Sequence, residues 1–338
     1  MRVVATESAV AHCIGDAAAI FAMSPPRYSI YTIIIAYQCD DQVVVKGAKM
    51  TNPRELVKNV ANIFSLPDIY FRISQLIDDP ACTSAKLAEV IAYDPGLTVR
   101  VLKLANGVYY GRSQRVETVA QAVTLIGTRD LRHLVLATST AQAFRNITSA
   151  IIDMDAFWQH SVCCALAARV LATHCQPQHR ERSFVAGLLH DVGQLVMVHQ
   201  IPDVAWKILG RLAETGGERY LLEQEELGFT HADVGAELLK SWELPASLWE
   251  PVECHHTPLE AKLFPVDTAL VHIGNAVANT MNLETRTSDP ADVAYRMDAR
   301  AWPICGQNET VLEEVALEVH AQWFGVFEVI WPGSSLIY

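Results

Sequence analysis

The sequence of 338 residues lacks a long apolar run, a basic segment and a secretory signal. No apolar run reaches the roughly 18 residues that a membrane-spanning helix needs, so we expect no membrane association. Lysines and arginines number 26 against 38 aspartates and glutamates, which leaves a formal net charge of -12. Binding to the phosphate backbone of nucleic acid needs a basic patch, so nucleic acid is excluded as an expected partner. An acidic substrate would need a locally positive patch or a metal ion.

The cysteines form neither a Cys-x-x-Cys motif nor the paired spacing of a zinc site. They stand at positions 13, 39, 82, 163, 164, 175, 254 and 305. Unpaired cysteines of this kind favour a reduced, cytoplasmic protein. The composition, 51% hydrophobic and 19% charged, predicts a folded chain with a sizeable core.

A His-Asp pair, His190-Asp191, stands inside the apolar segment from Phe184 to Val198. Apolar residues recur there at helical spacing and fill most positions between, which predicts one helix buried on nearly all sides. A buried aspartate is costly unless it is hydrogen-bonded, ion-paired or bound to a metal. The pair taken alone favours a structural role, with both side chains satisfied inside the core.

Four further histidines, His160, His231 and His255-His256, lie in or beside other apolar helical patterns. Imidazole and carboxylate together suit iron, manganese or zinc, and an aspartate can bridge two ions. Helices of a bundle can bring such residues together. The candidate metal ligands are therefore His160, His190, Asp191, His231, His255 and His256. His231 follows Thr230 in the first turn of a predicted helix, where the helix dipole favours a neutral imidazole.

The order of these residues resembles the core of HD-domain metal phosphohydrolases. His160 followed by His190-Asp191 is similar to that core, and His231 with His255-His256 is similar to the additional ligands of its HD-GYP branch. Further segments resemble the HDOD domain, the HD-related output domain of bacterial signalling proteins. These segments are Ser65 to Ile69, Ile91 to Thr98, Leu102 to Asn106, Val119 to Gly127, Gly187 to Gly193 and Ser241 to Pro245. The similarity runs from about Asn52 to about Ala278.

The resemblance implies an all-α fold, in which an N-terminal helical subdomain packs on a degenerate HD-like helical core. It divides the chain into residues 50–150 for the N-terminal helical half, 151–283 for the HD-like core and 284–338 for a C-terminal helical extension. Residues 1–49 resemble nothing in the family and form an N-terminal extension of unclear status. One hypothesis is that translation begins at Met50, and the alternative is a small accessory segment.

Three departures from the active enzymes bear on activity. The Gly-Tyr-Pro signature is absent after Thr257-Pro258, Asn275 takes the place of a ligating aspartate, and Gln194 stands where a lysine often follows the His-Asp pair. A neutral amide is a poorer ligand for a hard cation than a carboxylate. Losing the lysine removes a cation for phosphate oxygens. A divalent ion could still bind, but efficient turnover is not expected.

Two functions follow, and a third interpretation stays open. The HDOD resemblance implies a non-catalytic signal-transduction module that couples a signal to partner proteins. The HD-GYP resemblance implies a weak metal-dependent phosphohydrolase acting on a cyclic dinucleotide or nucleotide, which would make a nucleotide second messenger a ligand. The departures favour the first. In the third, the histidines satisfy one another in a buried polar network. Asn106 is either a cap or loop organiser, which we favour, or a partner-facing residue.

Overall fold

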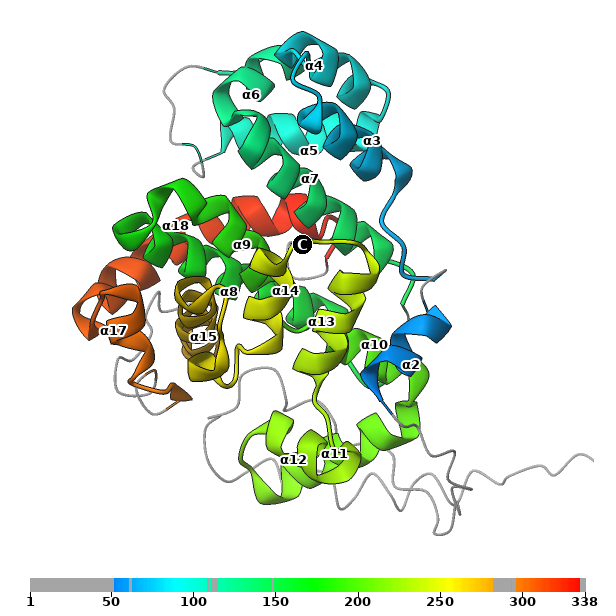
Figure 1. Ribbon diagram of the computed structural model, residues 1–338, viewed down its shortest axis with the longest axis vertical. Coiled ribbons are helices and arrows are strands. Elements are labelled where there is room, and N and C mark those ends of the chain that lie inside the picture. Colours follow the sequence, from blue (N-terminus) through cyan, green and yellow to red (C-terminus); the bar gives the residue numbers. More distant parts are fainter. Residues whose placement is uncertain are drawn as a thin grey trace, which may run out of the picture. The chain divides into compact units, whose positions relative to one another are not determined.

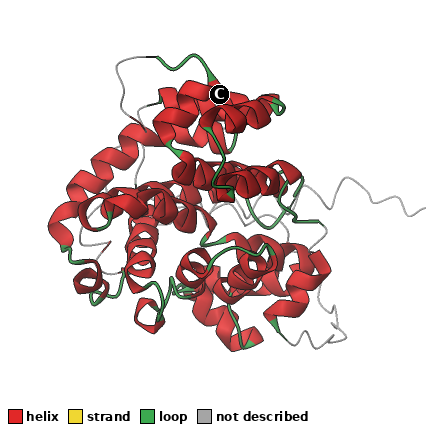
Figure 2. Ribbon diagram, turned by 45° about the horizontal axis from the view of Figure 1, so that its top comes forward, coloured by secondary structure: helices red, strands yellow, loops and turns green. Residues whose placement is uncertain are grey.

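A computed structural model of the chain describes residues 52–60, 63–107, 110, 115–147, 149–281, 293 and 296–334. Contacts divide the chain into two units, Met1–Gln38 and Cys39–Tyr338, and every described residue belongs to the second. The expected extension of residues 1–49, with the hypothesis of a start at Met50, lies outside the described residues. Within these described ranges the regular elements are all helical, which confirms the predicted all-α class (Figure 2).

Short helices make up the N-terminal part of the described chain. They are α2 (Pro53–Val60), α3 (Asp68–Asp78), α4 (Ser84–Ala92), α5 (Pro95–Asn106), α6 (Val119–Ile126) and α7 (Thr128–Ala143). Local signals define their ends. Asp94 caps α5 ahead of Pro95 in the first turn. Thr118 and Gln121 form a capping box at the start of α6. Gly127, at a φ of 84°, separates α6 from α7.

The remaining helices form the part that carries the histidines. They are α8 (Met154–Cys175), α9 (Arg180–Leu189), α10 (Val192–Gln200), α11 (Pro202–Thr215), α12 (Arg219–Leu227), α13 (His231–Ser241), α14 (Ala246–Glu253), α15 (Pro265–Thr280), α17 (Ala301–Cys305) and α18 (Leu312–Ile330). Short 3-10 turns lie at Pro177–His179, Pro258–Glu260 and Glu309–Val311. Helix α7 contacts α3, α5 and α6 on one side and α9 and α18 on the other, so it joins the two parts (Figure 1).

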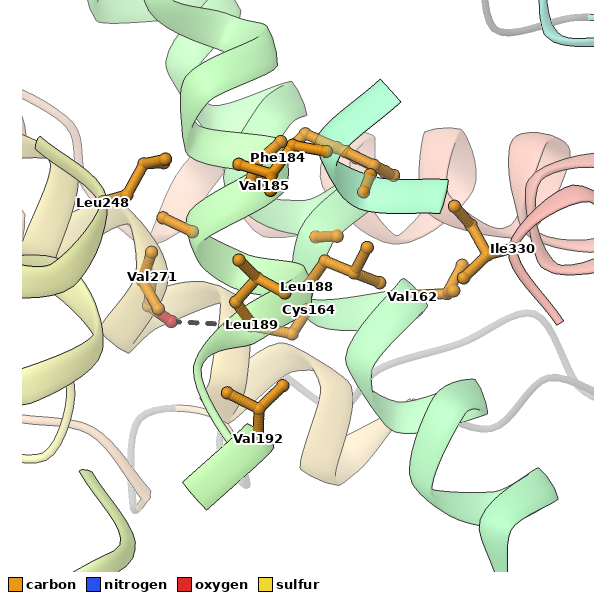
Figure 3. Close-up of a cluster of buried hydrophobic side chains, with 14 of the residues drawn as sticks. Val162, Cys164, Phe184, Val185, Leu188, Leu189, Val192, Leu248, Val271 and Ile330 are labelled. Carbon is orange, nitrogen blue, oxygen red and sulfur yellow. Dashed lines mark hydrogen bonds between the residues drawn. The ribbon is translucent and has the colours of Figure 1, made fainter. Parts of the chain in front are cut away.

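Helix α8 is the centre of the core, since it packs against α9, α15 and α18. Two glycines allow this close approach. A Cβ atom on Gly187 would lie 2.9 Å from the Cα of Ala165, and one on Gly274 would lie 2.9 Å from the carbonyl oxygen of Cys164. Apolar side chains of these helices and of α14 fill the space between them (Figure 3). Such a core holds α8 and α9 rigidly, and these helices position the site.

The predicted helix from Phe184 to Val198 is wrong in one respect, because the structure breaks it at the His-Asp pair. Helix α9 ends at Leu189 and α10 begins at Val192. Asp191 lies between them with a φ of -102° and a ψ of 1°. The apolar pattern carries no mark of this break, since nearly every position on both sides of it is buried and the periodicity has no exposed phase.

The turn between α9 and α10 also brings α10 into close contact with α13. A Cβ atom on Gly193 would lie 1.9 Å from the carbonyl oxygen of His231, so a glycine is required where the two backbones meet.

In the part of the chain that the structure describes, no helix combines the length and the apolar character that crossing a bilayer requires.

Candidate metal centre

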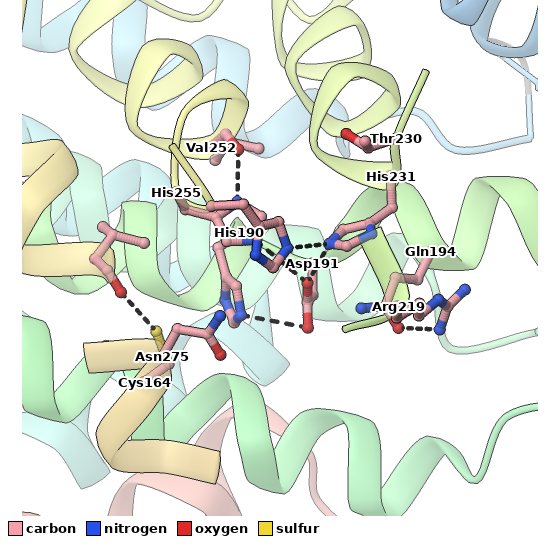
Figure 4. Close-up of polar contacts among 12 residues, drawn as sticks. Cys164, His190, Asp191, Gln194, Arg219, Thr230, His231, Val252, His255 and Asn275 are labelled. Atoms are coloured by element: carbon pink, nitrogen blue, oxygen red, sulfur yellow. Dashed lines mark hydrogen bonds and ion pairs between the residues drawn. The ribbon is translucent and has the colours of Figure 1, made fainter. Parts of the chain in front are cut away.

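The six predicted metal ligands come together at one place in the core. Figure 4 shows His190, Asp191, His231 and His255 there. His160 comes from α8, His190 and Asp191 from the turn between α9 and α10, His231 from the first turn of α13, and His255 and His256 from the segment after α14. They form two groups, one of His160, His190 and Asp191 and the other of His231, His255 and His256. Within each group the ligand atoms lie within 4.8 Å of one another.

The carboxylate of Asp191 lies between the two groups. Its Oδ2 is 3.3 Å from Nε2 of His190 and 3.6 Å from Nε2 of His160. Its Oδ1 is 3.0 Å from Nε2 of His231 and 3.8 Å from Nε2 of His255. One oxygen thus faces each group, which is the arrangement of a carboxylate that bridges two ions.

Backbone carbonyls fix the orientation of two imidazoles. Nδ1 of His190 lies 2.7 Å from the carbonyl oxygen of Gly187, and Nδ1 of His255 lies 2.7 Å from that of Val252. An Nδ1–H that donates to a carbonyl leaves the Nε2 lone pair available, and in both residues Nε2 points toward Asp191. Partners of this kind orient metal-binding histidines in proteins.

A carboxylate that the sequence analysis missed orients His231. Glu223 of α12 is fully buried, and its Oε2 accepts hydrogen bonds from Nδ1 of His231 at 2.6 Å and from the backbone N–H of His231 at 2.8 Å. Its Oε1 accepts from Nε of Arg219 at 2.7 Å. The sequence from Glu218 to Glu226 has the pattern of an acidic amphipathic helix. The i,i+4 pair of Arg219 and Glu223 in that pattern indicates an ion pair on one face of the helix. The sequence does not show that this face points toward the core.

The donor set fits a transition metal. Nε2 of His255 is buried and has no hydrogen-bond partner among the described residues. Pairs of imidazole nitrogens also face each other, with Nε2 of His160 3.3 Å from that of His190 and Nε2 of His231 3.0 Å from that of His256. A proton or a metal ion must lie between two such acceptor atoms. Five imidazoles around one carboxylate suit iron, manganese or zinc.

Three of the imidazoles stay neutral in the absence of an ion. Burial, helped by the neighbouring His190, lowers the pKa of His160 to about 4. Burial and then the charges of the surrounding imidazoles hold the pKa of His255 and of His256 well below the usual value. Neutral imidazoles are the form that binds metal, so these three need lose no proton on binding near neutral pH.

The expectation of a neutral His231 is wrong for the ion-free protein. Burial alone would lower its pKa, but the charges of Glu223 and Asp191 raise the pKa to about 9. Burial would also raise the pKa of Asp191, yet His190 and then His231 hold that pKa well below its usual value. Two adjacent carboxylates therefore outweigh the helix dipole, which acts only weakly at this range. A metal ion at Nε2 would take the place of the proton.

The two substituted positions border the centre. The Asn275 side chain lies beside His160, and its Oδ1 accepts a hydrogen bond from Asn279 at 3.0 Å. Oε1 of Gln194 accepts a hydrogen bond from Nη1 of Arg219 at 2.6 Å. A cationic side chain from α12 thus lies next to the position where the sequence analysis recorded a missing lysine.

His272 borders the site, whereas Asn106 does not. Nδ1 of His272 lies 2.7 Å from the carbonyl oxygen of His255, and its Nε2 accepts from the backbone N–H of Asp298 at 2.8 Å, so both nitrogens are engaged. Asn106 lies elsewhere in the fold. It donates to the carbonyl of Val116 at 2.8 Å and accepts from the N–H of the same residue at 2.7 Å, which are the bonds of a loop organiser.

The helical fold and the gathered His and Asp residues define a protein of the HD-related class. The sequence profile of the HDOD domain family matches residues 63–258, more than half of the chain, and the chain therefore belongs to the HDOD domain family.

Two solved structures share the fold. One is a candidate phosphohydrolase from Shewanella amazonensis SB2B, at 24% identity and a TM-score of 0.65, which covers 83% of this chain and 99% of its own. The other is an HDOD domain protein of unknown function from Geobacter sulfurreducens, at 22% identity and a TM-score of 0.60, covering 79% of this chain and 97% of its own. At these identities the likeness concerns the fold.

A curated relative, an uncharacterized protein of Treponema pallidum (strain Nichols), is 25% identical over 202 residues. The match covers 60% of this chain and 39% of the relative, so the chain spans well under half of that protein.

Proposed function

We propose that this chain is a non-catalytic signal-transduction module that encloses one or two divalent metal ions and couples a signal to partner proteins. Burial of the centre supports the proposal: His190 and His255 are 0% exposed and His231 is 1% exposed. A catalytic ion keeps an open position for water or substrate, whereas a closed site serves structure or sensing. The neutral amide of Asn275, in place of a further carboxylate, supports the same function.

The candidate ligands fall into two groups, and each group would hold one ion. His160, His190 and Asp191 would hold one ion, and His231, His255 and His256 would hold a second beside the other oxygen of Asp191. A bound iron, manganese or zinc ion would polarise a water molecule or a phosphoryl oxygen. In a closed centre, the same ions would stabilise the packing of α8, α10, α13 and the segment after α14.

Proteins are the partners that we propose, with a nucleotide second messenger as an alternative input. The net charge of -12 disfavours nucleic acid. A cytoplasmic location is part of the proposal, because the described cysteines, Cys82, Cys163, Cys164, Cys175, Cys254 and Cys305, are all free.

Elemental analysis of protein purified without a His-tag or added metal tests the metal centre. We expect near-stoichiometric iron, manganese or zinc in the wild type and in His174→Ala, and its loss in His160→Ala. The two substitutions lie on α8, and His174 is exposed and outside the centre. Absence of metal from the wild type after loading with each of these ions would overturn the metal centre.

A phosphodiesterase assay on cyclic di-GMP, with manganese or iron added, separates this proposal from the second candidate. That candidate is a metal-dependent phosphohydrolase, and it is favoured by the bridging position of Asp191 between two imidazole groups, which is typical of two-metal hydrolytic sites. We expect no turnover above that of His190→Ala. Turnover that His190→Ala abolishes would make the protein an enzyme.

A further inference from the structure

Arg100 of α5 is a half-buried cation whose hydrogen-bonding capacity the described chain leaves partly unused. Its Nε is buried and has no hydrogen-bond partner among the described residues. Its Nη2 donates to the neutral Oε1 of Gln142 at 3.4 Å, which is long for a hydrogen bond. Burying a charged group is costly unless the group is paired and hydrogen-bonded. Arg100 therefore offers a shielded donor for which the described residues supply no acceptor.

A second arginine lies near Arg100 and repels it. Burial lowers the pKa of Arg100, the charge of Asp94 opposes this fall, and the charge of Arg145 adds to it. Arg145 follows α7, and its Nη2 donates to the backbone carbonyl of Pro332 at 2.8 Å. Asp94 uses its Oδ1 to cap α5 through the backbone N–H of Leu97. Two like charges are thus held near each other, and neither forms an ion pair with a carboxylate of the described residues.

Two other shielded arginines of the described core do have carboxylate partners. Nε of Arg169 lies 3.1 Å from Oε1 of Glu181, and Nη2 of Arg182 lies 2.7 Å from Oδ2 of Asp267. The chain therefore neutralises cationic side chains internally where they serve the packing of helices. The missing ion pair at Arg100 indicates a counter-charge that comes from outside the chain.

The two arginines line a hollow where α5, α7 and the end of α18 meet. Gln142 of α7 and Trp331 after α18 also line it, and its described lining contains neither a carboxylate nor a candidate metal ligand. The room inside is about 10 Å³, enough for one water-sized group such as a single oxygen atom of an oxyanion. A ligand would therefore insert one small group and keep the rest of its body in solvent.

A planar carboxylate is the group that suits this hollow. Guanidinium donors form a rigid planar fork that matches the geometry of a carboxylate. Hydrogen bonds of this charge-assisted kind are roughly twice as strong as those to a neutral acceptor. A carboxylate would give Nε of Arg100 its missing acceptor and would offset the repulsion between Arg100 and Arg145. A tetrahedral phosphate is bulkier, and the small volume disfavours it.

We infer that Arg100 and Arg145 form a binding site for a carboxylate group, separate from the metal centre. The inference goes beyond the proposed function, because the site contains no candidate metal ligand and needs no ion. A free carboxylic acid and an acidic side chain of a partner protein carry the same group, so the experiment includes a probe for each source.

Thermal melting over a range of probe concentrations tests the inference, because a ligand that binds only the folded state raises the Tm. The probes are malonate, a free acid, and N-acetyl-glutamate amide, which carries the side chain of a protein glutamate, at constant ionic strength. We expect Arg100→Met and Arg145→Met to need roughly tenfold or more of either probe for the same rise, since each loses charge-assisted hydrogen bonds. Arg129→Met removes an exposed arginine of α7 outside the hollow and is the matched control, with the wild-type response expected.

Two further measurements distinguish binding from a structural role. The NMR signal of the Arg100 Nε–H, identified by its absence from Arg100→Met, should shift in the wild type with either probe, because the donor gains an acceptor. Without a probe, Arg100→Met should melt at or above the Tm of the wild type, since methionine removes an unpaired charge from a shielded position. A lower Tm would show that Arg100 serves the packing of α5 and would overturn the inference.

The remaining outcomes decide the site and its source of carboxylate. A wild type that responds to neither probe overturns the inference, as does an unchanged response in both Arg100→Met and Arg145→Met. Equal weakening in Arg129→Met also overturns it, because the effect would then belong to net charge. Tighter binding of inorganic phosphate than of malonate overturns the carboxylate assignment. Tighter binding of N-acetyl-glutamate amide supports the site and assigns it to a partner's acidic residue, and tighter binding of malonate supports the site and assigns it to a free acid.

Discussion

Two buried polar clusters lie along the same pair of helices, α8 and α9, and they are built in opposite ways. In the first, Oε1 of Glu181 accepts from Nε of Arg169 at 3.1 Å and from Nε of Arg180 at 3.3 Å. In the second, Nε2 of His160 faces Nε2 of His190 at 3.3 Å. The first cluster pairs opposite charges, whereas the second brings like acceptor atoms together.

The difference shows how a buried polar cluster reveals its role. The Arg169–Glu181 cluster supplies its own counter-charge, so it needs nothing from outside the chain and we interpret it as structural. In the histidine cluster the imidazoles outnumber the one carboxylate among the ligands, Asp191, so imidazole nitrogens face each other and need a proton or a cation between them. Burial was similar in both, with Arg169 and His160 each 7% exposed. Complementarity, and not burial, therefore marks the functional site.

The largest expected effect concerns the Arg169–Glu181 cluster. Glu181→Ala leaves Arg169 buried without its carboxylate, and breaking a buried ion pair in this way costs about 3–5 kcal/mol. We expect urea denaturation to show a loss of that size in the free energy of unfolding. Metal content per folded molecule should not change, because Glu181 is not a ligand. A loss below about 1 kcal/mol would show that this cluster does not stabilise the α8–α9 pair.

The second effect concerns the histidine cluster and depends on metal. An ion that binds only the folded state stabilises that state by about 2.7 kcal/mol when its free concentration is 100 times its Kd. We expect zinc or manganese at that excess to raise the Tm of the wild type and of Asp203→Asn, and to leave the Tm of Asp191→Asn unchanged. Asp203 is an exposed residue of α11, outside the centre. An equal metal-dependent shift in Asp191→Asn would refute the bridging role of Asp191.

A third change should make the histidine cluster a stronger metal site. Asn275→Asp adds a carboxylate beside His160. Substitutions of residues next to a metal ligand alter metal affinity by roughly tenfold. We expect competition with a chelator to show tighter binding by about that factor. Asn308→Asp, at the cap of the turn before α18, adds the same charge away from the centre and should have no effect. Unchanged affinity in Asn275→Asp would place that side chain outside the ligand sphere.

The smallest effects appear away from neutral pH in metal-free protein, and the two sides of the cluster should respond in opposite directions. The pKa of His160 falls to about 4 on folding, so the unfolded chain takes up its proton first and stability declines as the pH drops from 6.5 to 4. The pKa of His231 rises to about 9, so its contribution is complete below 6.5 and is lost as the pH rises to 9.

Substitution should separate these two pH dependences. We expect His160→Gln to flatten the acid limb of the stability profile and His231→Gln the alkaline limb. Chemical denaturation at intervals of pH, in the presence of a chelator, measures both limbs. If His160→Gln flattened the alkaline limb and His231→Gln flattened the acid limb, the result would contradict the charge distribution around Asp191.

Much of the fold was predictable because its signals are local. Asp94 before Pro95 and Thr230 at the start of α13 are caps whose hydrogen bonds involve residues within one turn. The break between α9 and α10 was not predictable, since it depends on the meeting of Gly193 with the backbone of His231. Contacts between distant segments leave no trace in the periodicity of either one.

The candidate site shows the same division. The chemistry of His190-Asp191 and of His255-His256 was visible as polar residues in apolar surroundings. Glu223 and Arg219 were missed because, in a helix with charges on several faces, nothing local indicates which pair points inward.

The amino-acid sequence by itself determined the all-α class, the capped helix starts such as those at Asp94 and Thr230, and the residue types available to a metal ion, since these follow from side-chain chemistry and from interactions within one turn. The tertiary structure alone decided that Asp191 faces two imidazole groups, that Asn275 lies beside His160, and that α12 turns Arg219 and Glu223 inward. These outcomes depend on which backbones can approach one another in a close-packed core, and the chain settles that only when all its helices are in place.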